Sequence, residues 1–153
     1  MPHILIVEDE PTTSWALAEG LSDDGYTIDT FRTAEEALVW LRAHRSDLVI
    51  TDFRLPGLSG LELAQKLSRG RHAQPVIVVT AYGSPETVRE LVRAGVCEVF
   101  PKPFHVDELR RAVHRALLAR VERRGTRARA TRSTRPEGRV QNGSGSSPLR
   151  KAA

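Results

Sequence analysis

The sequence predicts a doubly wound α/β fold, in which a five-stranded parallel β-sheet in the order 2-1-3-4-5 lies between two layers of helices. Short apolar segments rich in β-branched residues alternate with segments of helical periodicity, and the alternation occurs five times within residues 1–119. Parallel strands require crossover connections, which are right-handed and place helices on both faces of a sheet. The length suits one such domain and is too short for an eight-fold barrel.

The expected strands are four to six residues long, and three are apolar at consecutive positions, as is typical of strands buried on both faces. Helix starts are visible between them. Thr33 and Glu36 form a capping-box pattern, and Ser84 followed by Pro85 supplies an N-cap residue and a proline for the first turn. In chain order the strands are expected at His3–Val7, Tyr26–Phe31, Leu48–Thr51, Pro75–Thr80 and Cys97–Phe100.

The net charge of +4 is divided unevenly along the 153 residues. Residues 1–119 carry 13 Lys/Arg and 17 Asp/Glu, whereas residues 120–153 carry 10 Lys/Arg and 2 Asp/Glu. The net charge is therefore −4 for the first part and +8 for the second. Because residues 121–153 are nearly devoid of large apolar side chains, we expect a folded domain over 3–119 and a basic, low-complexity, disordered tail over 120–153.

Composition also limits the compartment in which the protein acts. The sequence has a single cysteine, Cys97, which cannot form an internal disulfide, and nothing in it argues for secretion. No apolar run approaches the ~18 residues of a membrane span, and acidic residues interrupt the early apolar run. We therefore expect a soluble cytoplasmic protein. Cys97, Trp15 and Trp40 are expected to be packing residues.

Polar residues follow four of the five expected strands. They are Glu8 and Asp9 after the first strand, Asp52 after the third, Thr80 at the end of the fourth and Lys102 after the fifth. The carboxyl ends of parallel strands lie at one edge of a sheet, where ligands bind at the switch in strand order. We therefore expect these side chains to form one site.

The predicted site suits phosphoryl chemistry. Three clustered carboxylates repel one another unless a cation neutralises them, and Mg²⁺ prefers carboxylate oxygens. Lys102 adds a positive charge and Thr80 a hydroxyl group. The metal ion and the lysine would neutralise phosphoryl oxygens while a carboxylate attacks phosphorus and forms an aspartyl phosphate.

The motifs at these strand ends resemble a known family in content, order and spacing. They are Glu8-Asp9, Asp52-Phe53-Arg54-Leu55-Pro56-Gly57, Thr80-Ala81 and Lys102-Pro103. Over residues 3–119 the sequence resembles the receiver domain of two-component response regulators, whose fold is flavodoxin-like. The resemblance implies a phosphorelay signalling protein that assists its own phosphorylation and dephosphorylation and is otherwise not an enzyme.

The resemblance also implies a role for each matching residue. Asp52 would accept a phosphoryl group from a histidine kinase or phosphotransfer protein, and Thr80, Ala81 and Lys102 would contact the phosphoryl group. Mg²⁺ would be held by Glu8, Asp9, Asp52 and the backbone carbonyl of Arg54. The output would be a contact with an unidentified downstream protein, without a membrane, and a phosphorylation-dependent dimer is compatible with the family.

One position departs from the family pattern. Receivers usually carry Tyr or Phe three residues before the lysine, and Val99 occupies that position here, followed by Phe100. Alternation along a strand places these two side chains on opposite faces, so Phe100 is not expected to replace the missing ring. We expect phosphorylation to be retained and its coupling to the output face, made by the fourth helix, fifth strand and fifth helix, to be weaker.

Two alternatives remain open. A Mg²⁺-dependent phosphohydrolase with an aspartyl nucleophile usually carries a second catalytic Asp two residues after the first, where this sequence has Arg54. The second alternative is a receiver whose arginine-rich tail binds nucleic acid, and the tail is the only segment for which such binding is expected. The tail is equally consistent with a solvated extension that has no partner.

Overall fold

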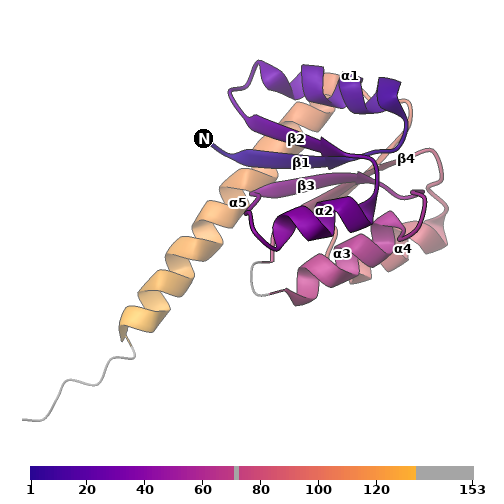
Figure 1. Cartoon of the computed structure of the whole chain (residues 1–153). Coiled ribbons are helices and arrows are strands. Elements are labelled where there is room, and N and C mark those ends of the chain that lie inside the picture. The colour runs from indigo at the N-terminus through magenta and orange to yellow at the C-terminus, as the bar shows by residue number, and fades with distance from the viewer. Residues whose placement is uncertain (71–72, 134–153) are drawn as a thin grey trace, which may run out of the picture.

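A computed structural model describes residues 1–70 and 73–133. Within them, five parallel strands form one sheet in the order β2-β1-β3-β4-β5 (Figure 1), which confirms the predicted fold class. The strands are β1 (His3–Val7), β2 (Thr27–Phe31), β3 (Leu48–Asp52), β4 (Val76–Thr80) and β5 (Glu98–Pro101). Each boundary lies within one residue of the prediction.

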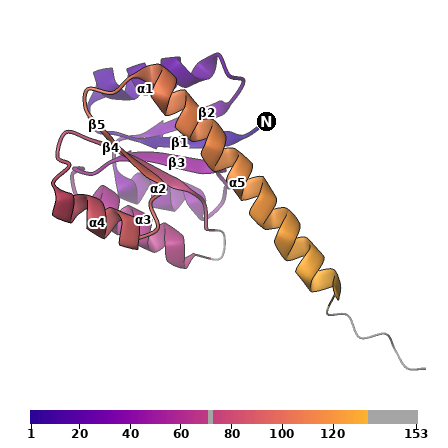
Figure 2. The same cartoon turned by 180° about the vertical axis from the view of Figure 1, so that it is seen from behind.

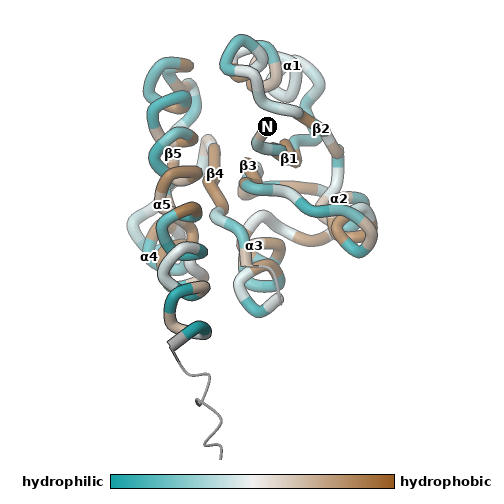
Figure 3. The backbone as a smooth tube through the Cα atoms, turned by 90° about the vertical axis from the view of Figure 1, so that its left-hand side faces the viewer, coloured by the Kyte–Doolittle hydropathy of each residue, from teal (hydrophilic) through white to brown (hydrophobic). Residues whose placement is uncertain are grey.

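Helices cover both faces of the sheet, as Figures 1 and 3 show. The helices α1 and α5 pack on one face, and α2, α3 and α4 pack on the other. Their bounds are α1 (Pro11–Ser22), α2 (Ala34–Leu41), α3 (Gly60–Arg69), α4 (Pro85–Arg93) and α5 (Val106–Ser133). This arrangement leaves the carboxyl edge of the sheet uncovered by helices and available for a site.

Two apolar clusters, one on each face, fix the central strands. Alternate residues of β1 point to opposite clusters, with Ile4 and Ile6 toward α1 and α5, and Leu5 and Val7 toward the other three helices. All residues of β3 and β4 are buried. The consecutive apolar positions in the sequence therefore reflect a sheet that is covered on both sides.

The sequence-predicted helix starts are present. The hydroxyl of Thr33 accepts a hydrogen bond from the Glu36 amide at the start of α2. The hydroxyl of Ser84 accepts one from the Thr87 amide at the start of α4, where Pro85 occupies the first turn. These caps satisfy amide groups that have no partner inside the helix.

The helix α5 continues across the expected domain boundary. It reaches residue 133, so residues 120–133 are helical, whereas the sequence predicted a disordered tail from residue 120 onward. The lack of large apolar side chains in this stretch argues against burial but not against a helix. Extending a helix that is already packed requires no new nucleation, and arginine and alanine are good helix formers. Residues 134–153 of the expected tail lie outside the described residues.

The last part of α5 projects away from the body of the domain. Both opposite views, Figures 1 and 2, show this extension leaving the sheet without another helix beside it. Its base is tied to the residues before β3, where the Arg120 guanidinium donates to the carbonyl of Ser46 at 2.7 Å and lies 3.3 Å from a carboxylate oxygen of Asp47. The extension therefore begins at the amino edge of the sheet.

Two expected packing residues are exposed. Trp15 on α1 is 65% exposed, and Cys97 lies exposed just before β5. Both predictions were wrong because helical or strand context does not by itself specify which face a residue occupies. Within the part of the chain described here, no helix is both long and apolar enough to span a membrane.

Candidate phosphoacceptor site

The predicted site residues lie at one edge of the sheet. Asp52 is the last residue of β3 and pairs in register with Val79, which precedes Thr80 at the end of β4. The amide of Lys102 donates to the carbonyl of Thr80 at 2.9 Å, which fixes the chain just after β5. Glu8 follows β1, the other neighbour of β3. Strand order alone thus brings together residues that are distant in the sequence.

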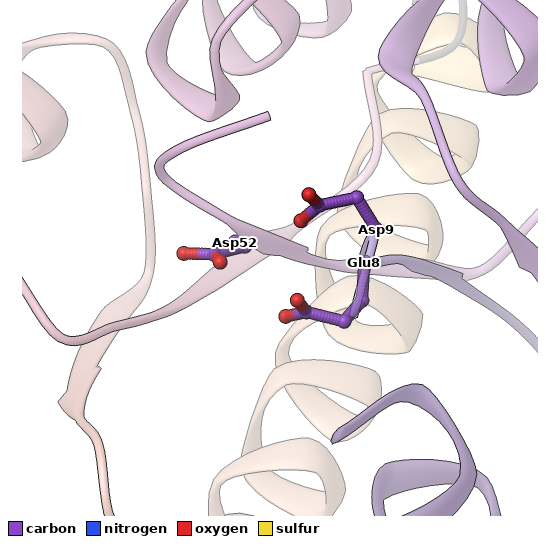
Figure 4. Close-up of side chains that lie close together, drawn as sticks. All are labelled: Glu8, Asp9 and Asp52. Atoms are coloured by element: carbon purple, nitrogen blue, oxygen red, sulfur yellow. The ribbon is translucent and has the colours of Figure 1, made fainter. Parts of the chain in front are cut away.

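Three carboxylates gather at this edge. Glu8, Asp9 and Asp52 each offer a carboxylate oxygen, and these oxygens all lie within 4.8 Å of one another (Figure 4). The side chain of Glu8 is 1% exposed and that of Asp52 is 11% exposed. Like charges that are so close and so little hydrated repel one another strongly, and the cluster requires compensating positive charge.

Lys102 supplies part of this compensation. Its Nζ donates to Oε2 of Glu8 at 3.0 Å and to Oδ2 of Asp52 at 3.0 Å. Within residues 1–70 and 73–133, no Lys, Arg or His side chain pairs with Asp9. The single lysine charge thus serves two of three carboxylates, and the cluster retains an excess of negative charge.

The pKa values of Glu8 and Lys102 reflect their burial and their contact with each other. Burial raises the pKa of Glu8 above its usual value, and the negative charge of Asp52 acts in the same direction, although the hydrogen bond from Lys102 opposes both. For Lys102, burial alone would lower the pKa, but the hydrogen bonds to Glu8 and Asp52 outweigh it and raise the pKa. Lys102 is therefore held as a cation at neutral pH.

The loop after β3 positions Asp52. The Arg54 amide approaches Oδ1 of Asp52 at 3.4 Å, and the Gly60 amide donates to the Phe53 carbonyl at 2.8 Å. Gly60 begins α3 so close to this loop that an added Cβ would lie 3.0 Å from the Cα of Phe53 and closer still to the carbonyl oxygen of Asp52. Only glycine fits here without displacing the backbone of Asp52.

A second feature of the loop has a contact that the sequence did not reveal. Gly57 has a φ of 78°, in the left-handed region that favours glycine. Beside it, the Glu35 carboxylate of α2 accepts a hydrogen bond from the Leu58 amide at 2.7 Å, which lowers the pKa of Glu35. Glu35 is separated from Leu58 by 23 positions. No local sequence signal could have linked them.

The loop after β4 completes the edge. Thr80 is fully buried, and its hydroxyl accepts a hydrogen bond from the Tyr82 amide at 3.1 Å. Ala81 lies exposed between them. The guanidinium of Arg54 stacks on the ring of Tyr82 at 3.7 Å from the ring centroid. This cation–π contact joins the loops after β3 and β4. No motif in the sequence pointed to Tyr82.

Val99 and Phe100 lie on opposite faces of the sheet, as the alternation of side chains along a strand predicts. Val99 packs partly buried against the cluster under α2, α3 and α4, whereas Phe100 packs against the cluster under α1 and α5. The Phe100 ring is therefore on the other face of the sheet from Val99. It does not occupy the position of the family's aromatic switch residue.

The acidic cluster could hold a metal ion, as judged from its donor atoms. Mg²⁺ binds carboxylate oxygens at about 2.0–2.1 Å, so that oxygens on opposite sides of the ion are about 4 Å apart. The carboxylate oxygens of the cluster lie within 4.8 Å of one another, which is compatible with a shared ion, and Asp9 has no cationic partner among the described residues. The residues present therefore fit a hard divalent cation.

Comparison with known proteins defines the class of protein that carries this fold and site. The family model of the response regulator receiver domain matches residues 4–114. The chain belongs to this family, whose members are signalling regulators of two-component systems.

The relatives are mostly longer proteins. The chain is 31% identical over 114 residues to the DNA-binding transcriptional regulator NtrC of Salmonella typhimurium, which covers 74% of this chain and 24% of NtrC. It is 38% identical over 120 residues to the nitrogen assimilation regulatory protein NtrX of Azorhizobium caulinodans, covering 76% and 26%. The chain thus spans about a quarter of the length of these two relatives.

Solved structures resemble the domain as a whole. A CheY-like response regulator receiver domain protein from Methanospirillum hungatei matches with a TM-score of 0.76 and 27% identity, over 80% of this chain and 98% of that one. The chemotaxis response regulator CheY4 of Vibrio cholerae matches with a TM-score of 0.71 and 27% identity, over 76% and 99%. The shared part is therefore the receiver fold.

Proposed function

We propose that this chain is a phosphoacceptor response regulator, in which Asp52 receives a phosphoryl group from a histidine kinase or phosphotransfer protein. The observation that carries the proposal is the contact of Lys102 Nζ with Asp52 Oδ2 at 3.0 Å inside a cluster of three carboxylates. A lysine ammonium group held beside a nucleophilic carboxylate can neutralise the oxygens of an incoming phosphoryl group. We place the reaction in the cytoplasm.

The reaction transfers a phosphoryl group from a histidine side chain of the donor to Asp52. A carboxylate oxygen of Asp52 attacks the phosphorus of the donor phosphohistidine, the P–N bond breaks, and the imidazole leaves with the bonding electrons. Attack of water on phosphorus later breaks the new O–P bond, which returns the Asp52 carboxylate and releases inorganic phosphate. The chain would assist both steps on its own phosphoacceptor.

The chain's own residues act by charge and position. Bound Mg²⁺ would supply positive charge to the phosphoryl oxygens, and Glu8, Asp9, Asp52 and the backbone carbonyl of Arg54 would hold it. Lys102 would turn one of its present contacts, with Asp52, into a contact with a phosphoryl oxygen.

The end of β4 would supply the remaining contacts. The Thr80 hydroxyl, at the neighbouring strand end, would donate to another phosphoryl oxygen. Ala81 has no side chain beyond Cβ, so its backbone can approach the phosphoryl group.

The output of the domain is proposed to be a contact with another protein. Residues 3–119 would act as the receiver domain, and the face formed by α4, β5 and α5 would change on phosphorylation and bind an unidentified target or a second copy of the chain. The coupling to this face is proposed to be weak, because Val99 offers less difference between two conformations than a moving ring does.

A labelling experiment tests the proposed function. The full chain is incubated with acetyl phosphate and Mg²⁺ and analysed on a gel that retards phosphoproteins. We expect one base-labile phosphoryl group in the wild type and in Asp23→Asn, which removes an exposed aspartate at the end of α1, and none in Asp52→Asn. Labelling of Asp52→Asn at the wild-type level would contradict the proposal.

A further inference from the structure

The extension of α5, residues 120–133, carries a cluster of positive charge that plays no part in the phosphoacceptor site. Residues 120–133 contain six arginines and one acidic residue, Glu122. Arg120, Arg123, Arg124 and Arg127 follow the spacing i, i+3, i+4, i+7, which places them on one face of a helix with 3.6 residues per turn. We call these four residues the arginine face. Among the described residues, no carboxylate forms an ion pair with Arg123, Arg124 or Arg127.

The arginine face meets a second basic element at its base. Arg120 is the one member that packs on the body, through Asp47 and the Ser46 carbonyl. Burial lowers the pKa of Arg120, and the nearby positive charges of Arg124 and Arg45 lower it further, while Asp47 acts in the opposite direction. Arg45 lies exposed in the loop between α2 and β3. Positive charge from two elements thus converges in the angle between the extension and the body.

This angle lies at the opposite edge of the sheet from the acidic site. Ser46 and Asp47 precede β3, whereas Asp52 ends it. The extension leaves the body from that edge, as Figures 1 and 2 show. Among the described residues, no other helix or strand lies against the extension. The molecule therefore carries separated charge, with carboxylates at the carboxyl edge and arginines at the amino edge and beyond.

From this geometry we infer that the three exposed members of the arginine face, Arg123, Arg124 and Arg127, together with Arg45, bind the phosphate backbone of duplex nucleic acid. Like charges three and four residues apart on a free helix repel one another, and a polyanion would relieve that repulsion. Duplex DNA presents about one charge per 1.7 Å of axis. A helix is about 10–12 Å across, which suits the major groove of about 12 Å.

The composition of the extension disfavours other anionic partners. Helices that bind lipid surfaces need a broad apolar face of Trp, Phe or Leu, and the only large apolar residue of the extension is Val121. Protein interfaces have an apolar or aromatic core, which the extension also lacks. Phosphate contacts need neither feature. Because the extension has no aromatic side chain to stack on bases, we expect binding that is independent of sequence and sensitive to salt.

Binding of the full chain to a fluorescent duplex of random sequence, measured by anisotropy at low salt, tests this inference. The triple variant Arg123→Gln, Arg124→Gln, Arg127→Gln retains good helix formers and is expected to bind about tenfold more weakly or worse. The slope of log K against log salt should become shallower by about 0.9 for each phosphate that the variant no longer engages. Unchanged affinity would overturn the inference.

A charge-matched control separates the arginine face from overall charge. Arg32→Gln, Arg93→Gln, Arg111→Gln removes three exposed arginines elsewhere on the domain and is expected to bind like the wild type. An equal loss of affinity in this control would show a bulk charge effect and would also overturn the inference. Circular dichroism and labelling by acetyl phosphate confirm that each variant is folded.

Two further measurements define the site and its ligand. Arg45→Gln alone should weaken duplex binding by less than the triple variant does, and unchanged affinity would remove the loop between α2 and β3 from the site. Vesicles of phosphatidylserine and phosphatidylcholine should bind more weakly than the duplex. Tighter binding to vesicles would assign the arginine face to a membrane surface and contradict a nucleic-acid role.

Discussion

Lys102 Nζ lies 3.0 Å from Oδ2 of Asp52, although 50 positions separate the two residues in the sequence. The contact exists because β3, β4 and β5 are neighbours in one parallel sheet and end at the same edge. The same lysine donates to Glu8, so one cation contacts two of the three carboxylates and offsets only part of their charge. The site therefore combines a nucleophile, a fixed cation and excess negative charge that favours a metal ion.

Mg²⁺ is expected to stabilise the folded protein. A ligand that binds only the folded state at 100 times its Kd adds about 2.7 kcal/mol to the free energy of unfolding, and Tm should rise with Mg²⁺ concentration. Asp9→Asn removes a charged ligand and should shift the response to higher concentrations. Asp23→Asn is the control and should respond like the wild type. An identical response from Asp9→Asn would exclude Asp9 as a ligand.

Gly60 is expected to be required for the position of Asp52. A Cβ on this residue would meet the backbone of Asp52 and Phe53, so Gly60→Ala should lower the free energy of unfolding by about 1–3 kcal/mol and slow labelling by acetyl phosphate. Gly83→Ala is a matched control, because nothing lies within 4 Å of its added Cβ. Chemical denaturation and labelling rates measure both effects. Equal behaviour of the two variants would contradict the packing argument.

Val99 is expected to limit the response of the output face. Beryllofluoride mimics a phosphoryl group, and its addition should cause large amide chemical-shift changes near Asp52 and Thr80 and small ones in α4. A ligand shifts an equilibrium only by its different interaction with the two states, and valine offers little difference. Val99→Tyr should enlarge the changes in α4. Large wild-type changes throughout α4 and α5 would show that the ring is not needed.

The ion pair between Asp24 and Arg110 is expected to make stability depend on pH. The hydrogen bond from Arg110 lowers the pKa of Asp24 below its ordinary value of 3.8. Because the folded-state pKa is lowered, the stabilisation is present above the ordinary value and is lost as pH falls through the lowered value. Asp24→Asn should therefore lower Tm at pH 7, and the difference should vanish in acid. A constant difference across this range would contradict the linkage.

Much of the fold could be predicted because buried parallel strands have a strong sequence signal. The apolar runs before Glu8, Asp52 and Thr80 located three strands, and strand order then brought the polar residues after them to one edge. The caps at Thr33 and Ser84 depend on residues three positions away and were equally readable. Local patterns were sufficient wherever the interaction itself is local or follows from topology.

The remaining features depend on contacts that no local pattern encodes. The Arg54–Tyr82 stack joins two loops, and Glu35 reaches the Leu58 amide from another helix. Trp15 is exposed although aromatic residues usually pack. The helical extension was missed because its composition argues against burial, whereas it is a continuation of a helix that is packed elsewhere.

The most direct test of the central claim is chemical mapping of the phosphorylated residue. Borohydride reduces an aspartyl phosphate to homoserine with release of phosphate, and tandem mass spectrometry locates the altered residue in the sequence. After treatment of the wild type with acetyl phosphate and Mg²⁺, the account predicts homoserine at position 52 alone and none in a sample that received no acetyl phosphate. Conversion at another aspartate, with Asp52 unchanged, would contradict it.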